Sequence, residues 1–184
     1  MKKFYKLLVL CFLLTSFKTI AQNNCSISVP ITAIPYNSGP LTTCGTVNDY
    51  PEGSYFEPFY GDGEDYVFSM FVSIAPLSYQ LTLGGSAEWK ILSVHSACPP
   101  TSANALGGII TNESGYGQTV INFPSNGLYF IFVDTWPPPD CGAFTLNITN
   151  PPPPPANDDC ANAQTVTCAT NYTGTTLMAA NDVL

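Results

Sequence analysis

The sequence predicts an all-β protein with the architecture of a β-sandwich, and three observations support that prediction. Short runs rich in Tyr, Phe, Val, Ile and Thr recur along the chain and are separated by turn residues. The 17 prolines and 14 glycines punctuate its whole length. No window sustains the apolar spacing of three and four residues that marks an amphipathic helix. Regularly spaced short strands of this kind are typical of sandwiches.

Eight strands are expected between residues 22 and 150. In chain order they are 26–34, 66–74, 78–83, 89–95, 106–111, 119–123, 128–134 and 143–149. Within the third of these, Tyr79, Leu81 and Leu83 share one face, and polar residues alternate with them. The run 128–133 is apolar on both faces, which predicts a central strand.

The first 21 residues have the pattern of a secretory signal. Three lysines precede an apolar run at 7–14, and small residues at 19–21 fit a cleavage site. The alternative is a membrane anchor, but eight continuous apolar residues are far short of the roughly 20 that span a bilayer. We therefore expect cleavage after residue 21 and a protein that is secreted or displayed on the cell surface.

The charge of the mature chain excludes several classes of partner. After residue 21, Lys90 is the single basic residue besides one histidine, and all thirteen acidic residues remain, which gives a formal charge of −12. Nucleic acids and anionic membranes are recognised through Lys and Arg, so neither is expected as a partner. An acidic chain of this kind is suited to divalent cations.

The chain begins the same pattern twice. Cys25 follows two asparagines, and Cys160 follows Asn-Asp-Asp directly after a run of five prolines. This predicts a signal at 1–21, a sandwich domain at 22–150, a stiff polyproline spacer at 151–155 and the start of a second similar module at 156–184. A polyproline II rod of five residues spans roughly 15 Å.

Six cysteines remain after cleavage, and an even number in an exported chain predicts disulfides. Matching the two copies of the pattern predicts three bonds: Cys25–Cys44, Cys98–Cys141 and Cys160–Cys168. The second bond would staple the irregular loops 96–108 and 136–142 at one end of the sandwich. Zinc is the alternative, but the chain has no CxxC pair and a single histidine.

The residues needed for catalysis are scarce, so we expect no enzyme. A Ser-His-Asp arrangement could use only His95, which lies at the exit of an expected strand. A lone histidine there is more often structural. Paired carboxylates are available, but a glycosidase would also need a cleft that a domain of this size rarely has.

Five segments together resemble the bacterial pre-peptidase C-terminal domain. Residues 63–69 are similar to its D-x-Y-x-F strand and 78–83 to the strand after it. Residues 90–94 are similar to its L-x-V strand, 127–134 to G-x-Y-Y-I-x-V and 142–148 to the closing G-x-Y-x-L-x-I. The start and the proline spacer also resemble modular surface proteins that gliding bacteria export by the type IX route, which implies an N-terminal fragment of a longer protein.

The resemblance, which covers about residues 60–150, implies a β-sandwich of jelly-roll type that is not catalytic. Such domains sit beside secreted proteases and other hydrolases, or in adhesins, and some relatives bind calcium or extracellular polymers. This chain departs from the family in its added cysteines and in lacking a neighbouring catalytic domain.

An acidic cluster is the candidate calcium site. Asp62, Glu64 and Asp65 lie on a Gly-rich segment, with Asp49 and Glu52 upstream. Calcium takes six to eight oxygen ligands, which clustered carboxylates can supply. The alternative is a solvated acidic turn, since the spacing does not complete an EF-hand loop.

Aromatic residues expected on the surface are the candidate ligand-binding set, because aromatic faces stack on sugar rings and apolar polymers. They are Tyr50, Tyr55, Phe56, Phe59, Tyr60, Tyr116 and Trp136. Trp136, Tyr116 and Tyr60 are the preferred binding residues, and Trp136 is the best single candidate because prolines place it in a loop. The alternative is that Trp136 packs against those prolines or against the predicted Cys98–Cys141 bond. Trp89 is expected in the core.

Three functions fit these observations. The preferred one is a non-catalytic extracellular binding, adhesion or targeting module whose partner is an extracellular polymer, a glycan or a protein. The second is an accessory domain of a secreted hydrolase or protease encoded beyond residue 184. The third is a spacer without a ligand. The fold alone does not separate them.

Overall fold

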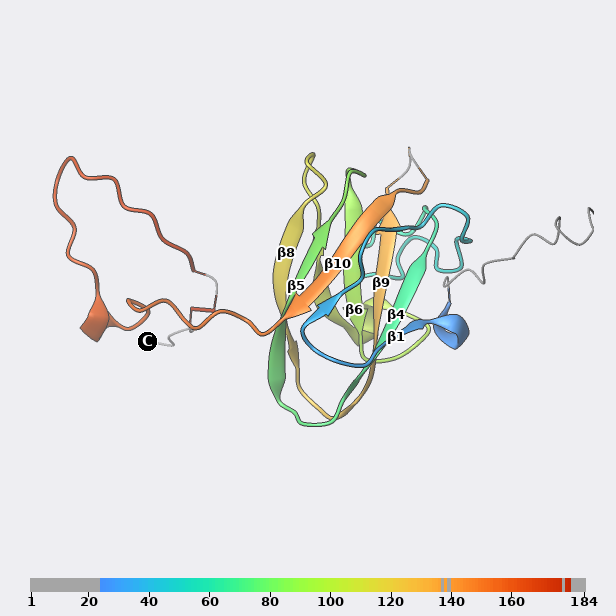
Figure 1. Cartoon of the computed structure of the whole chain (residues 1–184), viewed down its shortest axis with the longest axis horizontal. Coiled ribbons are helices and arrows are strands. Elements are labelled where there is room, and N and C mark those ends of the chain that lie inside the picture. Colours follow the sequence, from blue (N-terminus) through green and yellow to red (C-terminus); the bar gives the residue numbers. More distant parts are fainter. Residues whose placement is uncertain (1–23, 137, 139, 177, 180–184) are drawn as a thin grey trace, which may run out of the picture.

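A computed structural model describes residues 24–136, 138, 140–176 and 178–179, so the predicted signal lies outside the described residues. Two sheets form a sandwich (Figure 1). The first has the order β1-β4-β9-β6-β7 and the second β2-β10-β5-β8, with β3 paired to the start of β10. The strands are β1 (Val29–Ile31), β2 (Tyr36–Asn37), β3 (Leu41–Thr42), β4 (Tyr66–Val72), β5 (Leu77–Gly84), β6 (Lys90–His95), β7 (Ala105–Ile110), β8 (Gly117–Phe123), β9 (Gly127–Thr135) and β10 (Ala143–Thr149). The predicted all-β, disulfide-stapled sandwich of jelly-roll type is confirmed.

Seven of the eight expected strands form within a few residues of their predicted bounds. The predicted central strand, β9, lies between β4 and β6. The expected strand 26–34 is shorter, because a 3-10 helix (Cys25–Ile27) occupies its start and β1 is limited to three residues that pair in parallel with β4. The two-residue strands β2 and β3 were not predicted, since they show no alternation.

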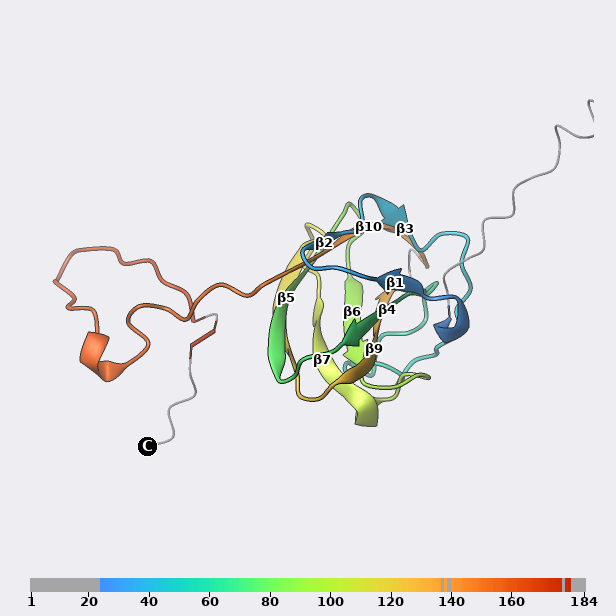
Figure 2. The same cartoon turned by 60° about the horizontal axis from the view of Figure 1, so that its bottom comes forward.

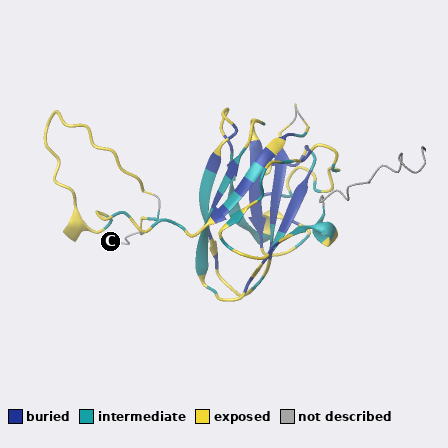
Figure 3. Ribbon diagram, in the orientation of Figure 1, coloured by how far each residue is buried: buried dark blue, intermediate teal, exposed yellow. Residues whose placement is uncertain are grey.

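The main core lies between the two sheets and follows from the period of two along each strand. In β4, Phe68 and Met70 point inward, and in β5 Leu81 and Leu83 face them from the other sheet. In β9, Ile131 belongs to the same cluster. Figure 3 shows this buried interior as the dark blue centre of the sandwich.

A third layer covers the outer face of the first sheet. The segment 43–65 between β3 and β4 contains no strand and packs on the outward side chains of β4, β6 and β9. Tyr55 is fully buried there, with its ring 5.8 Å from that of Phe132, and Tyr60 is also buried. Tyr50 lies 5.1 Å from the same Phe132 ring. The expectation that Tyr55 and Tyr60 are surface residues is therefore wrong, because both pack against apolar side chains on the outer face of the first sheet.

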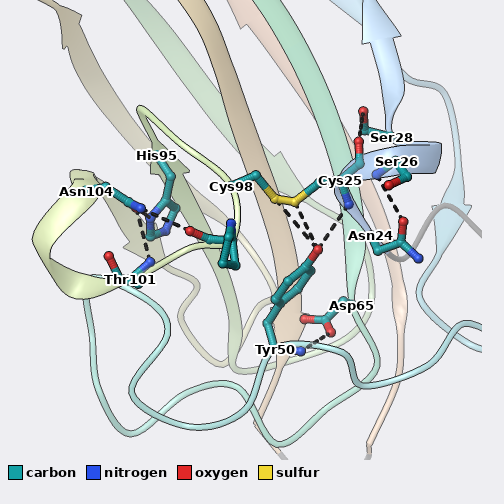
Figure 4. Close-up of a disulfide and its surroundings, with 11 residues drawn as sticks. Asn24, Cys25, Ser26, Ser28, Tyr50, Asp65, His95, Cys98, Thr101 and Asn104 are labelled. Atoms are coloured by element: carbon teal, nitrogen blue, oxygen red, sulfur yellow. Dashed lines mark hydrogen bonds between the residues drawn. A yellow bond between two sulfur atoms is a disulfide. The ribbon is translucent and has the colours of Figure 1, made fainter.

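The disulfide pairing differs from the prediction. The structure contains Cys25–Cys98 and Cys44–Cys141, with Cα–Cα distances of 6.2 and 4.8 Å. Both distances fall in the normal range for disulfides. Tyr50 supports the first bond, since its hydroxyl accepts from the Cys25 N–H at 3.0 Å and contacts both sulfurs (Figure 4).

Strand direction explains why the predicted Cys98–Cys141 bond is impossible. β6 and β9 are antiparallel, with Lys90 opposite Thr135. The chain therefore leaves the two strands at opposite ends of the sheet, with Cys98 following β6 and Cys141 following β9. Cys44 reaches Cys141 instead, because β3 pairs with the first residues of β10.

The residues described after 150 lie outside the sandwich (Figure 2). They contain a 3-10 helix at Cys160–Asn162, and those between 156 and 176 contain no strand. Cys160 and Cys168 are exposed and not bonded to each other, contrary to the predicted pair. The first cysteine of each copy begins a 3-10 helix. The second module itself stays a prediction. In the part of the chain described, no helix has the length and apolar character needed to cross a bilayer.

Candidate functional site

An aromatic pocket of about 570 Å³ opens at the end of the sandwich where β6 begins and β9 ends. Four segments form it: the covering layer 43–65, the turn before β6, the end of β7 and the residues after β9. The lining residues are Glu57, Phe59, Tyr60, Trp89, Ile110, Trp136 and Pro138. Both tryptophans of the chain are among them.

Trp89 is a pocket residue and not a core residue, which corrects the sequence-based expectation. Its side chain is 45% exposed. Its backbone has φ +51°, a left-handed conformation that is rare for a bulky side chain. A residue in that conformation does not continue the in-and-out alternation of side chains along the strand that follows it. The indole therefore does not enter the core. Strained conformations of this kind cluster at ligand sites.

Trp136 lies beside Trp89 across the sheet. Its backbone N–H donates to the Trp89 carbonyl at 3.0 Å, which continues the pairing of β6 with β9 by one residue. The Trp136 side chain is 48% exposed, as its predicted loop position requires. Tyr60 stands edge-on to it, with ring centroids 5.1 Å apart and planes at 89°. These two rings make adjoining walls of the pocket.

Phe59 and Glu57 complete the mouth of the pocket. Phe59 is 65% exposed, a high value for a phenylalanine that lies next to the buried Tyr60. Glu57 is half-buried and is the one carboxylate in the lining. Burial, assisted by the charge of Glu57, raises the pKa of Tyr60. The arrangement offers aromatic surface with a single negative charge at its edge.

The disulfide Cys44–Cys141 is close to this pocket in the chain. It fixes the far end of the segment that carries Trp136 and Pro138, while β9 fixes the near end. A loop held at both ends loses less conformational entropy when it binds a ligand.

The third residue of the predicted binding set lies elsewhere. Tyr116 is in the turn between β7 and β8, is half-exposed, and donates its hydroxyl to Gln118 Oε1 at 2.8 Å. The structure therefore brings Trp136 and Tyr60 together and leaves Tyr116 outside the lining.

The predicted calcium ligands are not gathered into one site. Asp65 is buried, and its oxygens accept from the Tyr55 hydroxyl and from the N–H groups of Asp49 (2.6 Å) and Tyr50 (3.0 Å). Glu64 accepts from Gly45 N–H at 2.6 Å, and Asp62 is exposed. Among the residues that the structure describes, no three His, Cys, Asp or Glu side chains are placed to hold a metal ion.

Asp65 instead forms a buried acidic pair with Asp134 of β9. Burial raises the pKa of Asp65 to about 7, although its three hydrogen bonds oppose the shift. Burial and the charge of Asp65 raise the pKa of Asp134 to about 8. Oδ2 of Asp134 and Oγ1 of Thr135 have no hydrogen-bond partner within the described chain. The sequence offered no signal for this pair, because Asp134 stands alone in an apolar strand.

Lys90 is also buried, at the same end of the sandwich. Its Nζ donates to the carbonyls of Ala87, Gly115 (3.1 Å) and Gly85 (3.5 Å). One ammonium group therefore links the turn before β6 to the turn before β8. Burial lowers its pKa to about 8. The single lysine after residue 21 is therefore used inside the protein.

One chain of hydrogen bonds has residue types found in hydrolases. Ser93 Oγ lies 2.7 Å from His95 Nε2, and His95 Nδ1 lies 2.7 Å from Asn104 Oδ1. Ser93 and His95 are fully buried, and Ser93 Oγ also accepts from Phe56 N–H at 3.3 Å. The hydrogen bonds among these side chains satisfy their polar atoms within the interior.

No known protein-family model matches the chain, and no curated protein matches it. Several solved structures are similar in part, and two of them are described here. One is the pre-peptidase C-terminal domain of collagenase from Bacillus anthracis, with 11% identity, a TM-score of 0.41, and coverage of 72% of this chain and 99% of that one. The other is Aeromonas hydrophila PliG, a periplasmic lysozyme inhibitor of g-type lysozyme, with 15% identity, a TM-score of 0.37, and coverage of 66% and 94%.

Proposed function

We propose that the protein is a non-catalytic binding module that acts outside the cell and uses the aromatic pocket to hold part of an extracellular polymer, a glycan or a protein. One observation carries the proposal: both tryptophans, each about half exposed, line the same cavity. Exposed tryptophan costs solvation free energy, and clustered aromatic side chains mark contact sites. The two disulfides are typical of proteins that leave the cytosol.

The pocket has the size and composition of a ligand site. Natural sites are concave, mostly apolar and roughly 300–1,000 Å³, with a few polar groups that orient the ligand. Here the polar side-chain groups of the lining residues are the Glu57 carboxylate, the Tyr60 hydroxyl and the two indole N–H groups, and the Cys44–Cys141 disulfide follows the segment that carries Trp136. A rigid aromatic site loses little entropy on binding, which raises affinity.

Comparison of Trp136→Ala with Tyr116→Ala tests the proposal. Both side chains are about half exposed, but Tyr116 lies outside the pocket. Retention of each variant is measured on a panel of immobilised glycans, matrix proteins and cell-surface polymers, with thermal unfolding as the folding control. For a ligand that retains the unmodified protein, Trp136→Ala should weaken binding at least about tenfold. Tyr116→Ala should bind normally. Equal retention of both variants and the unmodified protein would show that the pocket is not the site.

A further inference from the structure

The walls of the aromatic pocket suit a positive charge. Two indoles and the rings of Phe59 and Tyr60 line it. The face of an aromatic ring is negative, so a cation within about 6 Å of the ring centre is attracted, most strongly by tryptophan. The ring planes of Trp136 and Tyr60 are nearly perpendicular, so the two rings form adjoining walls of the pocket. Glu57 adds a full negative charge to the same lining.

The rest of the molecule reinforces this preference. The chain after residue 21 carries thirteen acidic residues, and Glu88 and Asp140 lie close in sequence to the pocket residues Trp89 and Pro138. Lys90, the single lysine, directs its Nζ to three backbone carbonyls in the interior. A field of one sign around a low-dielectric cleft concentrates ligands of the opposite sign.

Few side chains in the pocket lining can accept a hydrogen bond, and this disfavours cations that carry N–H donors. A primary ammonium has three donors and a guanidinium five, and each buried donor without an acceptor costs free energy. Among the lining side chains, Glu57 and the Tyr60 hydroxyl are the acceptors. Indole N–H groups only donate. A quaternary ammonium has no N–H donors, and its methyl groups can contact the aromatic faces directly.

We propose that the aromatic pocket binds a quaternary ammonium head group, with Trp89, Trp136, Tyr60 and Phe59 as the cage and Glu57 as the counter-charge. This inference rests on the proposed function and names the chemistry of the ligand. The cage is built partly from Trp89, which lines the pocket and whose backbone has φ +51°. The backbone strain that this conformation imposes is the second sign that the position serves a ligand.

Intrinsic fluorescence is a specific assay, because the chain has two tryptophans and both line the pocket. The mature full chain is titrated with choline and with 3,3-dimethylbutan-1-ol, which replaces the ammonium by a neutral carbon of the same shape. Choline should change the emission saturably, and the neutral isostere should bind at least about tenfold more weakly. Glu57→Gln should weaken choline binding several-fold. Glu113→Gln, at an exposed carboxylate in another turn, should leave it unchanged.

Three results would overturn the inference and leave the proposed function standing. The first is equal binding of choline and its neutral isostere, which would make the pocket merely apolar. The second is a change in tryptophan emission on adding a glycan or protein from the panel, together with no response to choline or tetramethylammonium. The third is tighter binding of arginine amide or lysine amide than of choline, since the pocket would then bind a basic side chain. Failure of the whole panel and of every cation would remove both proposals.

Discussion

The buried pair formed by Asp65 of the covering layer and Asp134 of β9 gives a direct test of how that layer packs on the sheet. Its Oδ1 accepts from the Thr135 N–H, while Oδ2 has no hydrogen-bond partner within the described residues. Burial, with the nearby charge of Asp65, raises the pKa of Asp134 to about 8. An aspartate in an unfolded chain ionises near pH 4. Between these values the folded protein binds more protons than the unfolded one, so stability falls as pH rises through that window.

The variant Asp134→Asn keeps the shape of the side chain and removes its ionisation. The interval from near pH 5 to near pH 8 covers about three pH units in which the folded Asp134 is protonated and the unfolded one is not. Each of these pH units lowers the unfolding free energy of the unmodified protein by about 1.4 kcal/mol. The upper limit is therefore about 4 kcal/mol. Sharing of protons with Asp65 reduces the effect. Between about pH 5 and about pH 9, we therefore expect the unfolding free energy of Asp134→Asn to rise by about 2 kcal/mol relative to that of the unmodified protein.

Urea unfolding followed by circular dichroism near pH 5 and near pH 9 measures this gain, with disulfides kept intact. Glu113→Gln is the matched control, because that carboxylate is exposed and far along the chain from the pair. It should change stability equally at both values. If Asp134→Asn shows the same change in unfolding free energy at both pH values, or gains stability only in acid, the buried pair does not titrate as described.

Two further predictions concern the covalent links and the buried lysine. Peptide mapping by mass spectrometry without reduction should find Cys25 linked to Cys98 and Cys44 linked to Cys141. Replacing either pair by serine should cost about 2–5 kcal/mol of unfolding free energy, and recovery of the pairs predicted from the sequence repeat would refute the described topology. Lys90→Met should cost about 2 kcal/mol near neutral pH, because three carbonyls lose their donor. Unchanged urea unfolding would show that those carbonyls find other donors.

Strand positions could be predicted from the sequence because alternation is a local property. The run that became β5 alternates, and its Leu81 and Leu83 are buried as that alternation predicts. The run that became β9 is apolar on both faces, and it lies in the centre of its sheet as predicted. The sequence predicts Tyr55 and Tyr60 on the surface, because an irregular segment has no regular alternation of apolar residues that would indicate which side chains are buried. Their burial depends on the outer face of a sheet whose strands come later in the chain.

The site was predictable only in part, for a similar reason. Trp136 is recognisable from the sequence because prolines follow it directly, and it is exposed in a loop as predicted. Trp89 begins an expected strand and is predicted in the core, whereas its backbone adopts φ +51° and its side chain lines the pocket. The disulfides depend on strand direction, which no spacing of cysteines reveals. Asp134 gained a partner only when β9 paired with β4.

The most direct test of the account is the pair of indole N–H signals in a ¹H–¹⁵N NMR spectrum of the full chain, since the chain has two tryptophans. If the pocket is the binding surface, any ligand that retains the protein should shift both indole signals together, with the same dissociation constant for each. Trp136→Ala should then abolish or strongly reduce the shift of the remaining Trp89 signal. Saturable binding that moves neither indole would place the functional surface elsewhere and contradict the account.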